Sequence, residues 1–248
     1  MGRVTLNKKG LTRIEKGLVE IPPRSSDSEW FIMTVKTDNV GISEDDEFQI
    51  PTTGGGYDYT VDWGDGNVTT GNIGTVTHTY AGAGTYTVKI KGDFPRIYFN
   101  NTGDRLKLIS IDQWGDIAWT SMRRAFSGCI NMVGNFTDAP DLSNPMSMTE
   151  MFFNCDAFNA DLSNWDTSNV TSMKQMFWSC LVFNGDITTW DVTSVLDFTE
   201  MFRVAVAFNR DISGWDVSNS QKFYGMFWSA TSFDQNLGAW DRDWETKH

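Results

Sequence analysis

Large apolar residues recur at a fixed 25-residue interval through the second half of the chain. A Met-Phe pair stands at Met151, Met176, Met201 and Met226, and a weaker copy of the pattern surrounds Phe126. Four copies in strict register predict a solenoid, because no single repeat can bury its apolar face alone. Three further columns keep the interval: Phe158, Phe183, Phe208 and Phe233; Trp165, Trp190, Trp215 and Trp240; and Asp166, Asp191, Asp216 and Asp241.

Within one repeat, apolar residues follow one another at three- and four-residue steps, which predicts a helical or 3₁₀ stretch. Asp166 precedes this stretch and is expected to cap exposed N–H groups. The segment 183–190, FNGDITTW, is predicted to be extended. Residues that recur once per coil should form buried columns, and each buried side chain should contribute about 1.5–3 kcal/mol. The three- and four-residue steps connect Val170, Met173, Phe177 and Cys180, and the expected core includes Met173, Phe177, Phe183 and Trp190.

The pattern changes to short β-rich segments between residues 29 and 100. WFIMTVKT, YDYTVDW, VTHTY and GTYTVKI are separated by the turn sequences TTGGG, GDGN and AGAG. Short strands with frequent turns predict an antiparallel β-sandwich. The expected fold class is therefore mainly β, an immunoglobulin-like sandwich followed by a leucine-rich-repeat-like solenoid of short strands and helical turns.

Two phrases in the first module carry a resemblance. VDWGDG at residues 61–66, followed by HTYAGAGTYTVKI at 78–90, resembles a PKD-type immunoglobulin-like domain. The resemblance implies a spacer or interaction module and no more. Asp65-Gly66 suits a tight hairpin because Gly accepts a positive φ. His78 and Tyr80 should lie near Trp63, with His78 as a structural rather than a catalytic residue.

The repeats carry a second resemblance over about residues 105–241. NWDTSNVTSMKQMFWSC and the leading segment KLISIDQWGDIAWTSMRRAF resemble the BspA-like, leucine-rich-type repeats of surface proteins. That resemblance implies a bacterial or phage origin and a surface or binding role without attached chemistry. The expected organisation is a basic arm (1–28), a PKD-like sandwich (29–100), a lead-in segment (101–124), the repeats (125–241) and a tail (242–248).

One column of the repeat does not fit the core. Phe153, Trp178, Arg203 and Trp228 directly follow the buried Phe and should point outward. Aromatic rings flanking an Arg make a candidate surface for a protein partner or a sugar ring. The alternative is that they pack over the next coil's turn.

Cysteines and aspartates follow the repeat as well. Cys129, Cys155 and Cys180 share a column with Ala205 and Ala230, which favours small, buried, reduced thiols, although neighbouring coils could bring two together. The Asp columns should cap turns rather than bind calcium, since no EF-hand-type loop is present. No metal or other cofactor is expected.

Charge is divided unevenly along the chain. Residues 1–24 carry six cations and two carboxylates, a net of +4, which leaves −16 on the remainder. An acidic body disfavours nucleic acid, and no apolar run is long enough to span a membrane. The basic segment is either a solvated tail or an arm that docks on an acidic partner. The arm residues are Arg3, Lys8, Lys9, Arg13 and Lys16.

Enzymatic activity is not expected, because no catalytic fingerprint appears and no coil departs chemically from its neighbours. Two functions remain. The first is an accessory virion protein, a bacteriophage capsid decoration or tail protein docked by its arm on capsid or tail subunits. The second is a bacterial cell-surface adhesin that binds a host protein or glycan. The lack of a signal-like start favours the virion, and homo-oligomerisation is left open.

Overall fold

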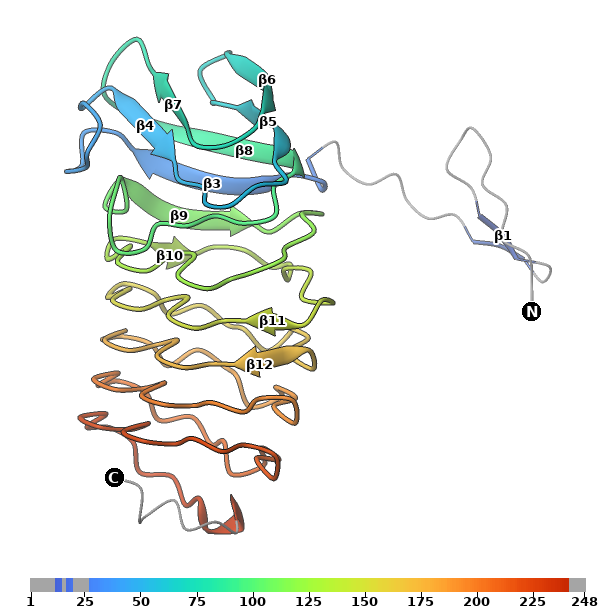
Figure 1. Ribbon diagram of the computed structural model, residues 1–248, viewed down its shortest axis with the longest axis vertical. Coiled ribbons are helices and arrows are strands. Elements are labelled where there is room, and N and C mark those ends of the chain that lie inside the picture. The colour runs from blue at the N-terminus through green and yellow to red at the C-terminus, as the bar shows by residue number, and fades with distance from the viewer. Residues whose placement is uncertain (1–11, 15–16, 20–26, 241–248) are drawn as a thin grey trace.

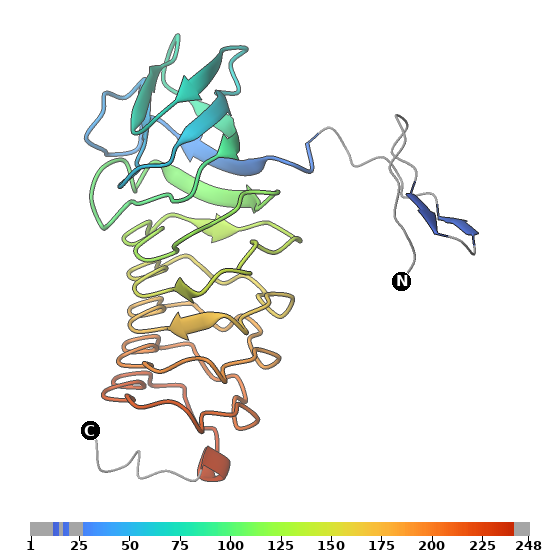
Figure 2. The ribbon, with the colours of Figure 1, turned by 45° about the vertical axis from the view of Figure 1, so that its right-hand side comes forward.

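The protein is an elongated stack with a β-sandwich at one end (Figure 1). The computed structural model describes residues 12–14, 17–19 and 27–240. Seen from a second direction, the coils of the second half lie one below the other in line with the sandwich (Figure 2). The predicted fold class, mainly β, is confirmed.

The larger sheet has six strands in the order β10 (Val133–Gly134), β9 (Leu108–Gln113), β3 (Phe31–Lys36), β8 (Thr85–Asp93), β5 (Asp58–Asp62) and β6 (Val68–Asn72). Its neighbours are antiparallel except β10 and β9, which are parallel. Residues in β3 alternate between buried and half-buried, as a strand with one face on a core requires.

A second, two-stranded antiparallel sheet consists of β4 (Glu47–Ile50) and β7 (Val76–Thr79). Phe48 and Ile50 of β4 are fully buried, as are Met33 and Val35 of β3. A separate antiparallel hairpin is formed by β1 (Thr12–Ile14) and β2 (Gly17–Val19).

Strand β9 joins the two modules, although it lies in the predicted lead-in segment. It pairs with β3 of the sandwich on one side and with β10 of the first coil on the other. The fully buried Lys107, one residue before β9, donates hydrogen bonds from Nζ to the carbonyls of Ser43, Glu44 and Glu47 at 3.1, 2.6 and 2.9 Å. The sheet of the sandwich therefore continues directly into the solenoid.

The coils pair through short parallel contacts before their turns. The strands β11 (Met146–Ser147) and β12 (Val170–Ser172) are parallel, and single bridges continue the row from Ser172 to Asp197 and to Lys222. The prediction of an extended segment at 183–190 was wrong. That segment contains a turn closed by the Trp190 N–H on the Ile187 carbonyl, 3.3 Å, and the strand lies at 170–172 instead.

The predicted helical stretch is also wrong, because each coil contains consecutive tight turns instead. The Met176 N–H donates to the Met173 carbonyl and the Cys180 N–H donates to the Phe177 carbonyl, both at 3.1 Å. Gln175 and Ser179, the third residue of each turn, have φ of 57° and 58°, as in type II turns. Three-residue spacing therefore reflects repeated turns. The N–H groups of Gln175, Phe177 and Ser179 donate to carbonyls of the next coil, whereas in a continuous helix they would donate to carbonyls of the same segment.

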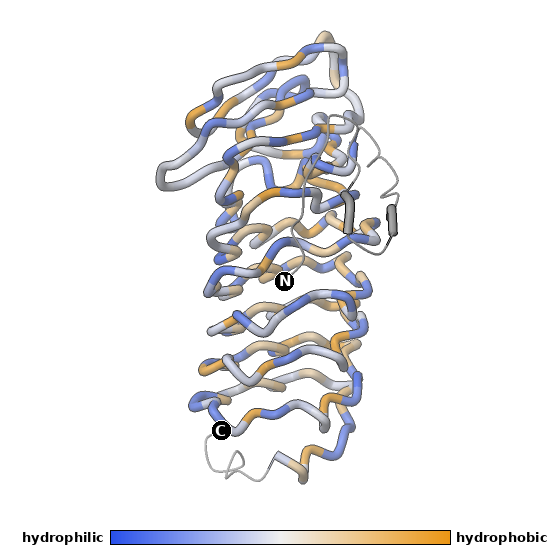
Figure 3. Tube along the Cα trace, turned by 90° about the vertical axis from the view of Figure 1, so that its right-hand side faces the viewer, coloured by the Kyte–Doolittle hydropathy of each residue, from blue (hydrophilic) through white to orange (hydrophobic). Residues whose placement is uncertain are grey.

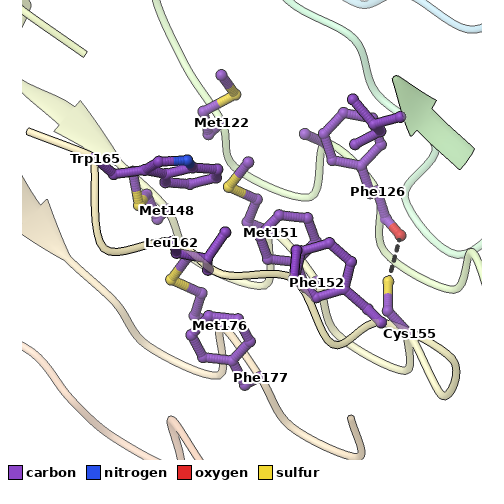
Figure 4. Packing of buried hydrophobic residues seen from close by; sticks show 14 of the residues in the cluster. Met122, Phe126, Met148, Met151, Phe152, Cys155, Leu162, Trp165, Met176 and Phe177 are labelled. Atoms are coloured by element: carbon purple, nitrogen blue, oxygen red, sulfur yellow. Dashed lines mark hydrogen bonds between the residues drawn. The ribbon is translucent and has the colours of Figure 1, made fainter. Parts of the chain in front are cut away.

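Aromatic columns fill the solenoid core, as predicted. Phe152, Phe177 and Phe202 are fully buried, and their neighbouring ring centroids are 5.7 and 5.8 Å apart. Methionine side chains and Trp165 surround the rings (Figure 4). Hydrophobic positions recur from coil to coil along the trace (Figure 3). The only 3₁₀ helix among the described residues, η1 (Gly238–Trp240), lies in the last coil.

Candidate functional site

The predicted outward column lies at the corner of the second tight turn of each coil. In the turn from Phe177 to Cys180, both end residues are fully buried, whereas Trp178 at the corner is only half-buried. The N–H of Ser179 donates to the Arg203 carbonyl at 2.8 Å, which holds each corner above the next. Backbone hydrogen bonding therefore fixes one side chain per coil on the same outer edge.

Contacts join these four side chains into a row, here named the outer ladder (Phe153, Trp178, Arg203 and Trp228). The rings of Phe153 and Trp178 meet edge to face with centroids 5.3 Å apart. The guanidinium of Arg203 lies between two indoles, 4.4 Å from the Trp178 centroid and 4.1 Å from the Trp228 centroid. Cation–π attraction favours this order of aromatic and cationic side chains.

Trp228 ends the outer ladder and is 54% exposed. Tyr224, 50% exposed, lies near it and was not among the predicted site residues. The repeat register contains the signal that could have found it. Tyr224 occupies the corner of the first turn of its coil, where earlier coils have Lys174 and Thr199.

Charged and amide side chains form a second row beside the outer ladder. Arg124 makes a two-pronged ion pair with Glu150, with both N···O distances 2.9 Å. Glu200 accepts a hydrogen bond from Gln175 at 2.7 Å and pairs with Arg203. Because Glu200 compensates the charge of Arg203, the outer ladder presents flat, largely neutral surfaces rather than a free cation.

The Asp columns accept hydrogen bonds from turn N–H groups, as predicted. Asp166 Oδ1 accepts from the Ser168 N–H at 3.1 Å, and equivalent bonds recur in the following coils. Hydrogen bonds from the following Ser hold the pKa values of Asp166, Asp211 and Asp216 below their usual range. Within the described residues, no three His, Cys, Asp or Glu gather closely enough to hold a metal ion.

The three cysteines are free and fully buried. The Cys155 thiol donates to the Phe126 carbonyl of the preceding coil at 3.1 Å (Figure 4). In the same way, the Cys180 thiol donates to the Phe152 carbonyl at 2.8 Å. Burial raises the pKa of each thiol, so these groups are not nucleophiles at neutral pH.

His78 has the structural surroundings that its sequence context predicts. Its ring stacks on Trp63 with centroids 4.7 Å apart and meets Tyr80 edge to face at 4.5 Å. Its Nε2 lies 2.8 Å from Asp65 Oδ2.

The predicted docking arm falls almost entirely outside the described residues. Arg13 lies in β1, whereas Arg3, Lys8, Lys9 and Lys16 are outside the part of the chain that the structure describes. Over that described part, no helix has the length and apolar character needed to cross a membrane.

The protein is a β-solenoid repeat protein. Its coils consist mainly of tight turns, stack on one another and carry the outer ladder along one edge. The family model described as "Mycoplasma protein of unknown function, DUF285" matches residues 97–200 and 120–240, together more than half of the chain. The chain belongs to this family of surface-protein repeats and is grouped with extracellular or surface proteins. No curated protein and no solved structure matches it.

Proposed function

We propose that the chain is a non-enzymatic binding protein displayed at a surface, and that it contacts a protein partner through the outer ladder. The observation that carries the proposal is the exposure of Trp228, 54%, at the end of a row of packed planar side chains. Exposed Trp and Tyr next to Arg are the side chains that dominate binding energy at protein interfaces. The surface-repeat family supports display at a surface.

The geometry of the outer ladder suits a binding platform. Arg203 is restrained by two indoles and by Glu200, so little side-chain entropy would be lost on binding. Partly exposed rings in a row offer apolar faces to a partner, while the neighbouring Arg124–Glu150 pair supplies a polar rim.

The test is binding to a panel of purified extracellular protein domains and to a glycan array. We expect the native chain to bind at least one protein, and Trp178→Ala combined with Trp228→Ala to weaken that binding at least tenfold. The matched control is Leu181→Ala combined with Leu196→Ala, two exposed apolar residues outside the outer ladder. If the folded variant with both Trp178→Ala and Trp228→Ala bound as tightly as the native chain, the proposal would be wrong. Binding to glycans alone would show that the partner is a carbohydrate rather than a protein.

A more specific placement, on a bacteriophage particle, is proposed on the strength of the basic segment at residues 1–24, net +4 against an acidic remainder. Complementary charge would dock such an arm on an acidic lattice. Mass spectrometry of what co-purifies with the native chain and with a variant lacking residues 1–28 tests this placement. Capsid or tail subunits recovered only with the arm would support it. Envelope material recovered with or without the arm would favour the cell-surface adhesin.

We also propose that residues 29–100 are a PKD-type module acting as a spacer. The stacking of His78 on Trp63 beside the Asp65 turn supports this assignment, because these residues carry the resemblance. An experimental structure of the full chain whose sandwich fails to superpose on PKD-type domains would refute it.

A further inference from the structure

Arginine side chains gather where the sandwich meets the first coil, although the residues outside 1–24 carry a net charge of −16. The segment that follows β8 runs beside the first coil, and its Asn100 N–H donates to the Arg124 carbonyl at 3.2 Å. This pairing brings Arg96, from the segment after β8, close to Arg123 and Arg124 of the coil. These three side chains are here named the arginine cluster (Arg96, Arg123 and Arg124).

Two contacts restrain the side chain of Arg96. Its guanidinium carbon lies 4.5 Å from the centroid of the Tyr98 ring, and its Nη2 donates to the Arg123 carbonyl at 3.0 Å. The Arg96 carbonyl accepts the Tyr57 hydroxyl at 2.9 Å, which ties the backbone of this residue to the sandwich. A guanidinium held by a ring and a carbonyl loses little side-chain entropy when it binds an anion.

The positive charge of the arginine cluster is only partly compensated. Arg124 pairs with Glu150, but within the described part of the chain no carboxylate lies within 4.0 Å of the guanidinium nitrogens of Arg96 or Arg123. Burial, and then the charges of Arg123 and Arg124, lower the pKa of Arg96. Because arginine stays charged at neutral pH, the three cations repel one another, and a bound anion would relieve that repulsion.

The ion pair inside the arginine cluster shows which anion fits. The Nε and Nη2 atoms of Arg124 each lie 2.9 Å from a carboxylate oxygen of Glu150. The planar fork of a guanidinium matches the two oxygens of a carboxylate. Arg123 is exposed, and neither its guanidinium nor Nη1 of Arg96 has an acceptor among the residues that the structure describes. These N–H groups are available to carboxylates of another molecule.

We propose that the arginine cluster binds an acidic segment of a protein partner, with the partner's carboxylates on Arg96 and Arg123. A nucleic acid or a sulfated polysaccharide presents a long row of anions, which the acidic remainder of the chain would repel. A short run of Asp or Glu needs the cluster alone. The chain's own basic segment, residues 1–24 with a net charge of +4, is excluded as the occupant by its charge.

The arginine cluster adjoins the outer ladder through Glu150, whose carbonyl accepts the N–H of Phe153 at 3.3 Å. Arg123 and Arg203 lie three coils apart. At the usual spacing of paired strands this is about 15 Å, which an extended segment of about five residues spans. One partner can therefore contact both surfaces. The inference does not rest on the proposed function, because the binding of carboxylates to the arginine cluster is measured without the outer ladder.

A hexaglutamate peptide is the probe, and calorimetric titration into the full chain measures its affinity. We expect binding that weakens as the salt concentration rises from about 50 to about 300 mM. Arg96→Gln combined with Arg123→Gln should weaken it about tenfold, because both open guanidinium groups are removed. The matched control is Lys89→Gln combined with Lys91→Gln. It removes the same charge from β8, where the two lysines pair with Asp27 and Glu29, and should leave the affinity unchanged.

Two further variants separate the arginine cluster from folding and from the outer ladder. Arg123→Gln alone changes an exposed side chain without a partner among the described residues, so the fold should survive while peptide binding weakens about threefold. Trp178→Ala combined with Trp228→Ala should leave hexaglutamate affinity unchanged, whatever it does to binding of the protein panel.

Three outcomes would overturn the inference. The first is no hexaglutamate binding, or an equal loss in the arginine and lysine double variants, which would show that only overall charge matters. The second is tighter binding of a single-stranded hexanucleotide or of heparin than of hexaglutamate, which would make the partner a different anionic polymer. The third is self-association of the native chain that Arg123→Gln abolishes, which would identify a second copy of this acidic chain as the occupant.

Discussion

At the scale of single residues, Asp65 fixes the tight turn between β5 and β6 and ties it to β7. Its Oδ1 accepts the N–H of Asn67 at 3.0 Å, and its Oδ2 lies 2.8 Å from His78 Nε2. Desolvation alone would raise the pKa of Asp65, but the hydrogen bonds from His78 and Asn67 outweigh it and lower the pKa to about 2. The ionised carboxylate is therefore part of the folded turn.

Because the folded-state pKa of Asp65 lies below the value of roughly 3.9 expected in the unfolded chain, its contribution to stability is present above that value. The contribution should be lost as the pH falls from about 4 to about 2. We expect Asp65→Asn to lower the free energy of unfolding at pH 5 and to flatten its pH dependence in this window. Urea unfolding between pH 2 and 6 measures both. An acid slope equal to that of the native chain would contradict the prediction, and Asp62→Asn, in the same hairpin, is the control.

At the scale of elements, the paired tight turns decide how the coil is built. The third residue of the second turn has a positive φ in every coil from Gly128 onward. Asn154 and Ser179 tolerate this conformation, but Val204 holds it at φ 60° with a β-branched side chain. The inter-coil hydrogen bond of 2.8 Å from the Val204 N–H to the Trp228 carbonyl keeps the residue there.

Val204→Asn should raise the free energy of unfolding by about 1 kcal/mol, because Asn adopts the left-handed conformation more readily than a branched residue. Chemical denaturation monitored by circular dichroism measures the change. Val206→Asn is the matched control, since Val206 is half-buried in the same coil and has no positive φ. Equal effects of the two substitutions would rule out backbone strain as the cause.

At the scale of the whole molecule, the sandwich and the solenoid share one hydrophobic core. Trp114 is fully buried at their junction, with ring centroids 5.8 Å from Phe31 of β3 and 5.9 Å from Phe126 of the first coil. It also meets Trp165 at 5.4 Å. The six-stranded sheet crosses the same junction through β9, so the sandwich covers the first coil as a cap does in repeat proteins.

Since the core is continuous, calorimetry and tryptophan fluorescence should report one shared unfolding transition for both modules. Trp114→Ala should destabilise that transition by about 3–5 kcal/mol, the usual cost of truncating a buried Trp. Trp228→Ala, on the exposed edge, should change stability by less than about 1 kcal/mol. Two separate transitions in the native chain would show that the modules unfold independently.

The sequence alone determined the features that depend on periodicity. A repeat of constant length forces equivalent residues into columns, so the buried Phe and Trp rows and the small Cys and Ala column followed from register. The sequence also placed Phe153 and Trp178 directly after a buried Phe, but it left open whether they point outward or pack over the next coil's turn. The turn at Asp65 followed from its local Asp-Gly chemistry.

Only the tertiary structure decided what depends on partners distant in sequence. Three-residue apolar spacing fits both a helix and a run of tight turns, and the choice was made by N–H groups that pair with the next coil. The joining of the two modules through β9 and the placement of Arg203 between two indoles arise in the same way. Each feature depends on the hydrogen-bonding and packing partners that other coils and strands supply. A local sequence pattern does not contain that information.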